Sequence, residues 1–258
     1  MQEERVFLYI VGTAGSGKST LTHAFREWLA YKGLDAITVN LDPGAENLKY
    51  SPDVDIRDWV SLREVMEEYD LGPNGAQIVC ADMVALNIEE IKETINSFKT
   101  NYVIIDTPGQ IELFVFREAG RIITLSLDPN RSLVAFLLDP ILTKTASDFV
   151  SQLLLSITTR FRLNLPLINI LSKCDLIKED KLLEIKNWSS MDDNLYETLL
   201  RERASISREL SEQIMHLLRH FDEGSSLIAV SSEDFTGMED LYNALQMCFR
   251  GGEDTLSD

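Results

Sequence analysis

The chain has 258 residues, and 45% of them are hydrophobic, enough for one sizeable core plus an insertion. Its formal net charge is −18, which argues against a general binder of nucleic-acid backbones, so we expect no direct nucleic-acid partner. The three cysteines are scattered, which argues against a disulfide framework or a cysteine metal site. No apolar run approaches the roughly 18 residues of a membrane span. With a polar start at Met1–Arg5 and no signal peptide, the sequence predicts a cytoplasmic protein without a membrane partner.

Short apolar runs alternate with helical patterns along most of the chain, and the runs are typical of buried strands in a parallel sheet. The predicted strands are Val6–Val11, Ala36–Asn40, Tyr102–Ile105, Ser132–Leu138, Leu167–Leu171 and Leu227–Val230. The predicted helices are Ser19–Tyr31, Ile56–Tyr69, Ala81–Phe98, Ala146–Phe161 and Met238–Phe249. This alternation predicts an α/β fold with a mostly parallel, doubly wound sheet flanked by helices.

Residues 178–223 break the alternation, because they carry helix-forming polar sequence and no strand signal. Apolar residues recur there at helical spacing and predict one long amphipathic helix, Asn194–Phe221. This helical insertion before the last strand is either a lid on the sheet or a docking surface for a client protein. His216 and His220 stand one turn apart without a third ligand, so we expect solvated side chains rather than a metal site. We expect a single domain over residues 1–250, followed by a frayed acidic tail over 251–258.

The segment Gly12–Ser19 has two glycines in the spacing of a Walker A loop, followed by Lys18-Ser19. It lies between a predicted strand and a predicted helix, where backbone amides and the helix N-terminus form an anion cradle. Lys18 would reach the β and γ phosphates, and the Ser19 hydroxyl would ligate Mg²⁺. This context predicts a P-loop NTPase fold, in which the phosphate-binding residues are Gly15, Ser16, Gly17, Lys18, Ser19 and Thr20.

Three further carboxylates and a glutamine follow strand ends near this loop. Asp106 ends one strand and can hold Mg²⁺ through water, while the Gly109 amide can meet the γ-phosphate. Asp42 follows another strand. It is either a turn former, or a functional residue that belongs to the Mg²⁺ shell or contacts the attacking water. Gln110 stands at the offset of the water-orienting glutamine of small GTPases. Glu112 is a candidate general base or a structural residue.

The segment Ser172–Asp175 predicts the part of the site that reads the base. Asp175 could accept two hydrogen bonds from guanine, and adenine offers neither donor in that geometry. The Lys173 stem could lie over the base. The usual guanine motif is Asn-Lys-x-Asp, and Ser172 replaces the asparagine, which weakens the tether to the P-loop. The amides of Ser231 and Ser232 could close over the base after the last strand.

The segment Leu71–Ala76 is locally a turn, because Gly-Pro and Asn-Gly both interrupt regular structure. With the P-loop, the segment Asp106–Gln110 and the segment Ser172–Asp175, however, the chain resembles the GPN-loop GTPases. The stretches Asn40–Gly44 and Pro52–Asp58 support this resemblance, which covers nearly the whole chain. The short C-terminus is similar to that of archaeal members.

The resemblance implies a Mg²⁺-dependent enzyme that hydrolyses GTP to GDP and phosphate as a homodimeric molecular switch. In such a dimer, Asn74 would orient water or the γ-phosphate in the partner's site, and Pro73 would stiffen the loop. Thr13 stands where some relatives in the wider class carry a second P-loop lysine, which leaves the trans role to Asn74. The resemblance also implies a downstream role in assembling a protein complex. Two alternatives stay open: an ATP-using enzyme of the same fold, and an assembly or chaperone scaffold whose hydrolysis is incidental.

Overall fold

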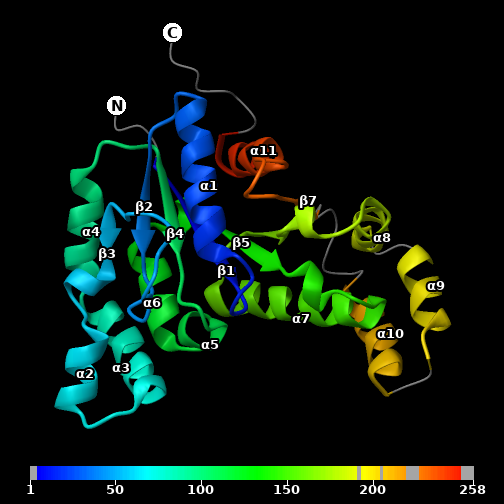
Figure 1. Ribbon diagram of the computed structural model, residues 1–258, viewed down its shortest axis with the longest axis horizontal. Helices are drawn as coiled ribbons and strands as arrows, with labels where there is room; N and C mark the ends of the chain where they lie inside the picture. Colours follow the sequence, from blue (N-terminus) through cyan, green and yellow to red (C-terminus); the bar gives the residue numbers. More distant parts are fainter. Residues whose placement is uncertain (1–4, 191–192, 204–205, 219–226, 251–258) are drawn as a thin grey trace.

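The computed structural model describes residues 5–190, 193–203, 206–218 and 227–250. A parallel sheet of seven strands, in the spatial order β3-β2-β4-β1-β5-β6-β7, forms the centre of the molecule (Figure 1). The strands are β1 Val6–Gly12, β2 Ala36–Asn40, β3 Val54–Asp55, β4 Tyr102–Asp106, β5 Ser132–Leu138, β6 Leu167–Leu171 and β7 Ile228–Ala229. All six predicted strands are present. The edge strand β3 was missed because its two residues contain no apolar run.

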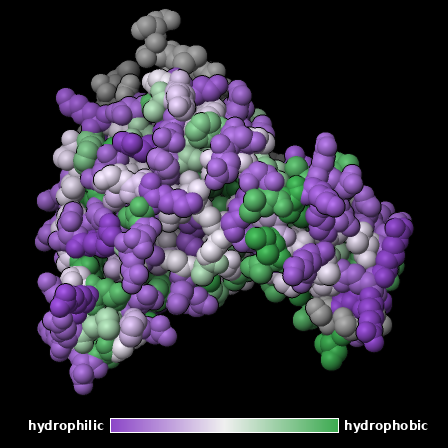
Figure 2. All heavy atoms as spheres, viewed as in Figure 1, coloured by the Kyte–Doolittle hydropathy of each residue, from purple (hydrophilic) through white to green (hydrophobic). Residues whose placement is uncertain are grey.

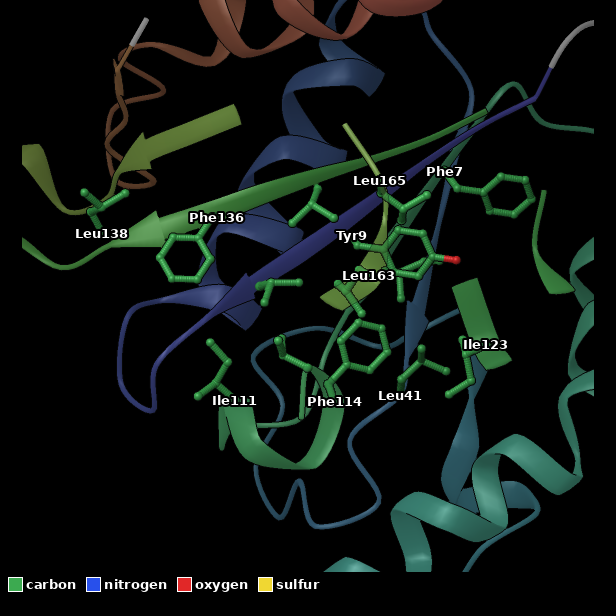
Figure 3. Close-up of a cluster of buried hydrophobic side chains, with 14 of the residues drawn as sticks. Phe7, Tyr9, Leu41, Ile111, Phe114, Ile123, Phe136, Leu138, Leu163 and Leu165 are labelled. Carbon is green, nitrogen blue, oxygen red and sulfur yellow. The ribbon is translucent and has the colours of Figure 1, made fainter. Parts of the chain in front are cut away.

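Alternate residues of the strands build a core on each face of the sheet. In β1, Phe7 and Tyr9 belong to one core and Leu8 and Ile10 to the other, as the two-residue period of a strand requires. Figure 3 shows the first core, where the Tyr9 ring stacks on Phe114. The second core is closed by two helices, α1 Lys18–Tyr31 and α11 Met238–Arg250. Helices therefore cover both faces of the sheet, as the doubly wound prediction requires.

The first core is covered by helices that the sequence predicted only in part. They are α2 Leu62–Glu68, α3 Pro73–Leu86, α4 Ile88–Ser97, α5 Ile111–Phe114, α6 Glu118–Ser126 and α7 Ala146–Leu163. The short helices α5 and α6 were not predicted. They pack closely against each other, because a Cβ on Gly120 would lie 1.9 Å from the Phe114 carbonyl oxygen. Short 3₁₀ turns complete the connections at η1 Ile56–Asp58, η2 Pro129–Arg131, η3 Pro140–Leu142 and η4 Cys174–Leu176.

Two predicted helices have different boundaries. The prediction of a helix at Ile56–Tyr69 was wrong in its first half, because Ser61 caps a new helix by accepting from the Glu64 amide. The predicted helix Ala81–Phe98 starts earlier and is interrupted at Asn87. The helix starts at Pro73, which follows the extended Gly72 and has no N–H to leave unpaired. The segment Leu71–Ala76, expected as a turn, is therefore a helix N-terminus.

The helices α8 Glu179–Ser189, α9 Asp193–Arg201 and α10 Ile206–Leu218 form an arm at the β7 end of the sheet (Figure 1). The single long helix predicted over Asn194–Phe221 was wrong. Glu202 follows α9, and its carboxylate accepts from the amide and hydroxyl of Ser147 at the start of α7. That contact ties the end of α9 to α7 instead of extending the helix.

The arm packs on α7, which fits the lid interpretation of the insertion. Leu199 of α9 and Met215 of α10 are fully buried. Ile206 and Leu210 of α10 remain exposed, and Figure 2 shows hydrophobic residues gathered where the arm joins the body. His220, Phe221 and the tail 251–258 lie outside the described residues, as does the side chain of His216. Among the described helices, none is long and apolar enough to cross a membrane.

Candidate nucleotide-binding site

The carboxyl ends of the parallel strands bring most of the predicted site residues to one edge of the sheet. The loop after β1 carries the P-loop, Asp42 follows β2, and Asp106 is the last residue of β4. Asp139 follows β5 and Lys173 follows β6. In open α/β sheets this edge is the usual place of ligand binding, next to the strand where the order reverses. Here that strand is β1, between β4 and β5.

The glycines of the P-loop give the backbone a path that other residues would not adopt. Gly15 and Gly17 have φ of 77° and 100°, in the left-handed region. A Cβ on Gly12 would lie 2.7 Å from Ser16 Oγ, so glycine is needed there for close approach. No side chain caps the N-terminus of α1, which leaves its amides for an anion.

Lys18 is buried at the centre of this loop. Its ammonium donates to the carbonyls of Gly12 and Thr13, both at 3.0 Å, and to the Gly109 carbonyl at 2.9 Å. Burial lowers the pKa of Lys18, and the charges of Asp106 and Asp42 oppose that shift. Lys18 therefore joins the P-loop to the segment after β4, at the position where it would meet phosphate oxygens.

Asp106 provides the carboxylate of the predicted metal site. Its side chain is 1% exposed, and Oδ1 has no hydrogen-bond partner in the described part of the chain. Burial raises the pKa of Asp106 to about 6, although Ser19, Tyr50 and Lys18 act in the opposite direction. An unpartnered carboxylate oxygen beside a serine hydroxyl is a set of hard oxygen donors, the type that Mg²⁺ prefers. The residues present therefore fit a magnesium ion that also binds phosphate and water.

Asp42 connects the loop after β2 to the loop after β4. Oδ2 of Asp42 accepts from the Gly109 amide at 2.9 Å, and Oδ1 accepts from the Gly44 amide at 2.9 Å. Gly44 in turn lies against Gln77 of α3, since a Cβ on Gly44 would be 3.0 Å from Gln77 Nε2. The turn-former interpretation is correct for the Gly44 contact. The amide expected to meet the γ-phosphate is the one that Asp42 binds here.

A cavity of about 310 Å³ adjoins the P-loop on the other side. Its wall includes Gly17, Thr20, Ser172, Lys173, Asp175, Leu176, Ser232 and Glu233. Asp175 is exposed and Ser232 is half-buried. Ser231 is buried instead, and its hydroxyl accepts from the Glu233 amide, so its side chain shapes the turn. The cavity thus lies where the sequence predicts the base, between the segments that follow β6 and β7.

Ser172 and Lys173 hold the P-loop from the side of this cavity. The Ser172 hydroxyl lies 2.8 Å from the Ser16 carbonyl oxygen, so serine makes the tether expected of asparagine in the usual motif. Lys173 Nζ donates to the Gly15 carbonyl at 2.6 Å and pairs with Asp139 at 2.7 Å. The Lys173 stem lies over Gly17, where a Cβ would be 3.6 Å from Lys173 Cε.

Two site residues that sequence reasoning missed are neighbours in the connection between β2 and β3. Lys49 lines the cavity, and the Tyr50 hydroxyl donates to Asp106 Oδ2 at 3.0 Å. No spacing motif identifies either residue. The sequence offers one indication: both residues lie in the connection after β2, a strand whose carboxyl end reaches the site.

Comparison with known proteins agrees with this geometry. A family profile described as a conserved hypothetical ATP binding protein matches residues 10–251. GPN-loop GTPase 3 of Saccharomyces cerevisiae is 42% identical over 180 residues, which cover 68% of this chain and 66% of the yeast protein. GPN-loop GTPase 3 of Schizosaccharomyces pombe is 33% identical over 226 residues, 84% of this chain and 82% of that protein. The chain belongs to the GPN-loop GTPase family.

A solved structure of a related GTPase matches this chain over nearly its whole length. The apo crystal structure of PAB0955, a GTPase from Pyrococcus abyssi, matches with a TM-score of 0.85 at 29% identity. The match covers 95% of this chain and 98% of that one. The chain is thus a nucleotide-binding P-loop protein from a family of GTP-hydrolysing enzymes. The profile description mentions ATP, whereas these relatives are named GTPases.

The Gly-Pro-Asn motif of the family lies at the start of α3. Asn74 is the second residue of α3 and is exposed, and it has no side-chain hydrogen bond to the described residues. Gln110 precedes α5 and Glu112 lies in its first turn, and both are exposed. Gln110 directly follows Gly109, whose carbonyl Lys18 binds, so of these three residues it is joined most directly to the phosphate side.

Proposed function

We propose that this GPN-loop protein is a Mg²⁺-dependent GTPase that works as a homodimeric switch. The observation that carries the proposal is the edge of the sheet where Gly109 joins Lys18 to Asp42 and where the charge of Asp106 acts on Lys18. A P-loop lysine, a buried carboxylate and a backbone amide are the groups needed to position a triphosphate and neutralise its charge. The adjoining cavity supplies the space for the nucleoside.

On the phosphate side, GTP would replace contacts that the protein makes with itself. Phosphate oxygens are better acceptors than the carbonyls of Gly12 and Gly109, so the Lys18 ammonium would transfer to them. The γ-phosphate would likewise take the Gly109 amide from Asp42. Asp42 is then free to orient the attacking water with Gln110. Ser19 directly, and Asp106 through water, would hold Mg²⁺, which neutralises charge on the phosphate oxygens when bound.

On the base side, Asp175 is the residue that would distinguish guanine from adenine. Its carboxylate would accept from two guanine donors, and with adenine it would lose both hydrogen bonds. Ser172 and Lys173 support this role by holding the P-loop beside the cavity. The amide of Ser232, on the cavity wall, would contact the base.

The exposure of Asn74 and of apolar side chains on the helices beside it supports the proposed homodimer. The helices α3, α6 and α7 pack side by side on one face of the sheet. These helices and the segment between α5 and α6 expose large apolar side chains: Ile78, Leu86, Phe116, Ile122, Leu125, Leu154 and Phe161. Such a set of apolar residues is typical of a protein interface. A second copy on this face would bring Asn74 near the partner's γ-phosphate, where its neutral amide would orient water or phosphate.

For the cellular role, we propose a cytoplasmic protein that assists assembly of a protein complex. The arm α8–α10, with exposed Ile206 and Leu210, is the proposed docking site for the client. The scaffold alternative, with incidental hydrolysis, uses the same arm. Retention of a client by GTP-loaded but not GDP-loaded protein would support the switch over the scaffold.

Equilibrium binding and hydrolysis with matched nucleotides test the enzyme proposal. We expect GTP to bind at least about tenfold more tightly than ATP, because a hydrogen bond to a charged group contributes about 1.5–3 kcal/mol and adenine makes none to Asp175. We also expect chelation of Mg²⁺ to abolish hydrolysis. Equal affinities for GTP and ATP would contradict the base assignment, and full hydrolysis in EDTA would contradict the metal.

A further inference from the structure

The connection between β2 and β3 contacts the metal carboxylate through one tyrosine. Tyr50 donates from its hydroxyl to Asp106 Oδ2 at 3.0 Å. The other carboxylate oxygen, Oδ1, is buried and has no hydrogen-bond partner among the described residues. One oxygen of Asp106 is therefore fixed by the protein, and the other is left for a ligand.

The Tyr50 ring stacks on a neighbouring ring, and the chain that carries it is anchored close by. The ring stacks on His23 of α1, with ring centroids 6.3 Å apart and planes inclined by 9°. His23 follows Ser19 by one helical turn, so the ring leans on the helix that carries the P-loop lysine and serine. Asp53 fixes the chain three residues later by accepting from the amide and hydroxyl of Thr38 at 2.8 and 3.1 Å. The Tyr50 hydroxyl thus reaches Asp106 from a constrained position.

The residue before Tyr50 lines the nucleotide cavity. Lys49 contributes to the same wall as Thr20 and Asp175. Two consecutive residues of one connection therefore face the two parts of the site, the cavity and the metal carboxylate.

We propose that Tyr50 is a positioning residue of the magnesium site. By occupying Oδ2, its hydroxyl orients the Asp106 carboxylate so that Oδ1 faces the ion and its waters. Groups that orient a metal-binding side chain from behind typically contribute about 10–100-fold to metal affinity. This role rests on the proposed Mg²⁺-dependent nucleotide binding, and it adds a residue to which no motif assigns a part.

The Tyr50→Phe variant removes the hydroxyl and keeps the ring on His23. The measurement is the Mg²⁺ concentration that gives half-maximal retention of a fluorescent GDP analogue, with Mn²⁺ binding by electron paramagnetic resonance as a second readout. We expect about a tenfold higher Mg²⁺ midpoint for Tyr50→Phe. Tyr69→Phe is the matched control, because Tyr69 is an exposed tyrosine at the end of α2 and should keep the midpoint unchanged.

The outcomes separate this inference from the proposed function. An unmodified protein that retains GDP equally with and without Mg²⁺ would contradict the proposed function itself. A Mg²⁺-dependent unmodified protein with the same midpoint as Tyr50→Phe would overturn the role of Tyr50. GDP affinity in EDTA should be unchanged in Tyr50→Phe, and an equal loss of GDP affinity with and without Mg²⁺ would mark a structural role and also overturn it.

Discussion

The phosphate side and the base side of the nucleotide site differ in how deeply their charged residues are buried. On the phosphate side, Lys18 and Asp106 are almost fully buried, and Asp42 uses both carboxylate oxygens on backbone amides. On the base side, Asp175 is exposed and Leu176 is 64% exposed. One side is formed before a ligand arrives, and the other is an open wall.

This difference teaches that the two sides contribute in different ways. Charged groups that are already positioned by folding need no reorganisation during the reaction, so they stabilise a transition state strongly. An open wall contributes mainly to the choice between ligands, because only the correct base pairs with its carboxylate. Substitutions on the phosphate side should therefore change the rate most, and those on the base side the specificity.

Lys18→Ala tests the phosphate side with the largest expected effect. Loss of the buried ammonium should reduce the rate of GTP hydrolysis by about 10³-fold, in line with the loss of a charged or polar group at developing charge. Single-turnover hydrolysis with saturating enzyme measures it. Lys99→Ala, an exposed lysine far from the P-loop in sequence, is the control and should keep the full rate. If Lys18→Ala hydrolyses GTP within tenfold of the unmodified rate, the proposed larger contribution of the phosphate side to the rate is contradicted.

Asp175→Asn tests the base side. We expect about a hundredfold loss of GTP affinity with little change in ATP affinity, because two charge-assisted hydrogen bonds are lost. Xanthosine triphosphate should regain affinity, since xanthine carries an acceptor where guanine carries its amino donor. Asp180→Asn, in the first turn of α8, is the matched control. Equal losses for GTP and ATP would show that Asp175 supports the cavity without reading the base.

Asp106→Asn tests the buried carboxylate without any ligand. Because burial raises the pKa of Asp106 from 3.8 to about 6, the folded state binds this proton more tightly than the unfolded chain. Stability therefore falls as the pH rises from about 4 to about 6 and stays lower above it. The Asn variant should melt roughly 5 °C higher at pH 8, and the difference should shrink toward pH 4. Asp35→Asn, an exposed control, should show no such pH dependence, and a constant gain for Asp106→Asn would contradict the account.

The sequence predicted the central sheet well because its strands are buried on both faces. A continuous apolar run such as Ser132–Leu138 has few other interpretations. The errors lie where a tertiary contact decides the local structure. Glu202 leaves the helical path to bind Ser147, and β3 exists only because it pairs with β2. Neither contact has a local signal.

The site was predictable where a motif fixes backbone geometry, and less so elsewhere. The positive φ of Gly15 and Gly17 follows directly from the loop sequence. Ser172 was expected to tether the P-loop poorly, yet its hydroxyl lies 2.8 Å from the Ser16 carbonyl oxygen. Tyr50 has no motif, because its contact with Asp106 depends on the path of a connection between two strands.

The claim that a second copy completes the site is tested most directly by mixing two inactive variants. Lys18→Ala removes the P-loop lysine and keeps Asn74, while Asn74→Ala keeps the P-loop and should lower kcat with nearly unchanged GTP affinity. After the two are unfolded together and refolded, a random mixture has half its dimers mixed, each with one complete site, so about one quarter of the unmodified activity should return. If Asn74 acts within its own chain, or has no part in hydrolysis, mixing will give no more than the average of the two variants, and the account of a shared site is contradicted.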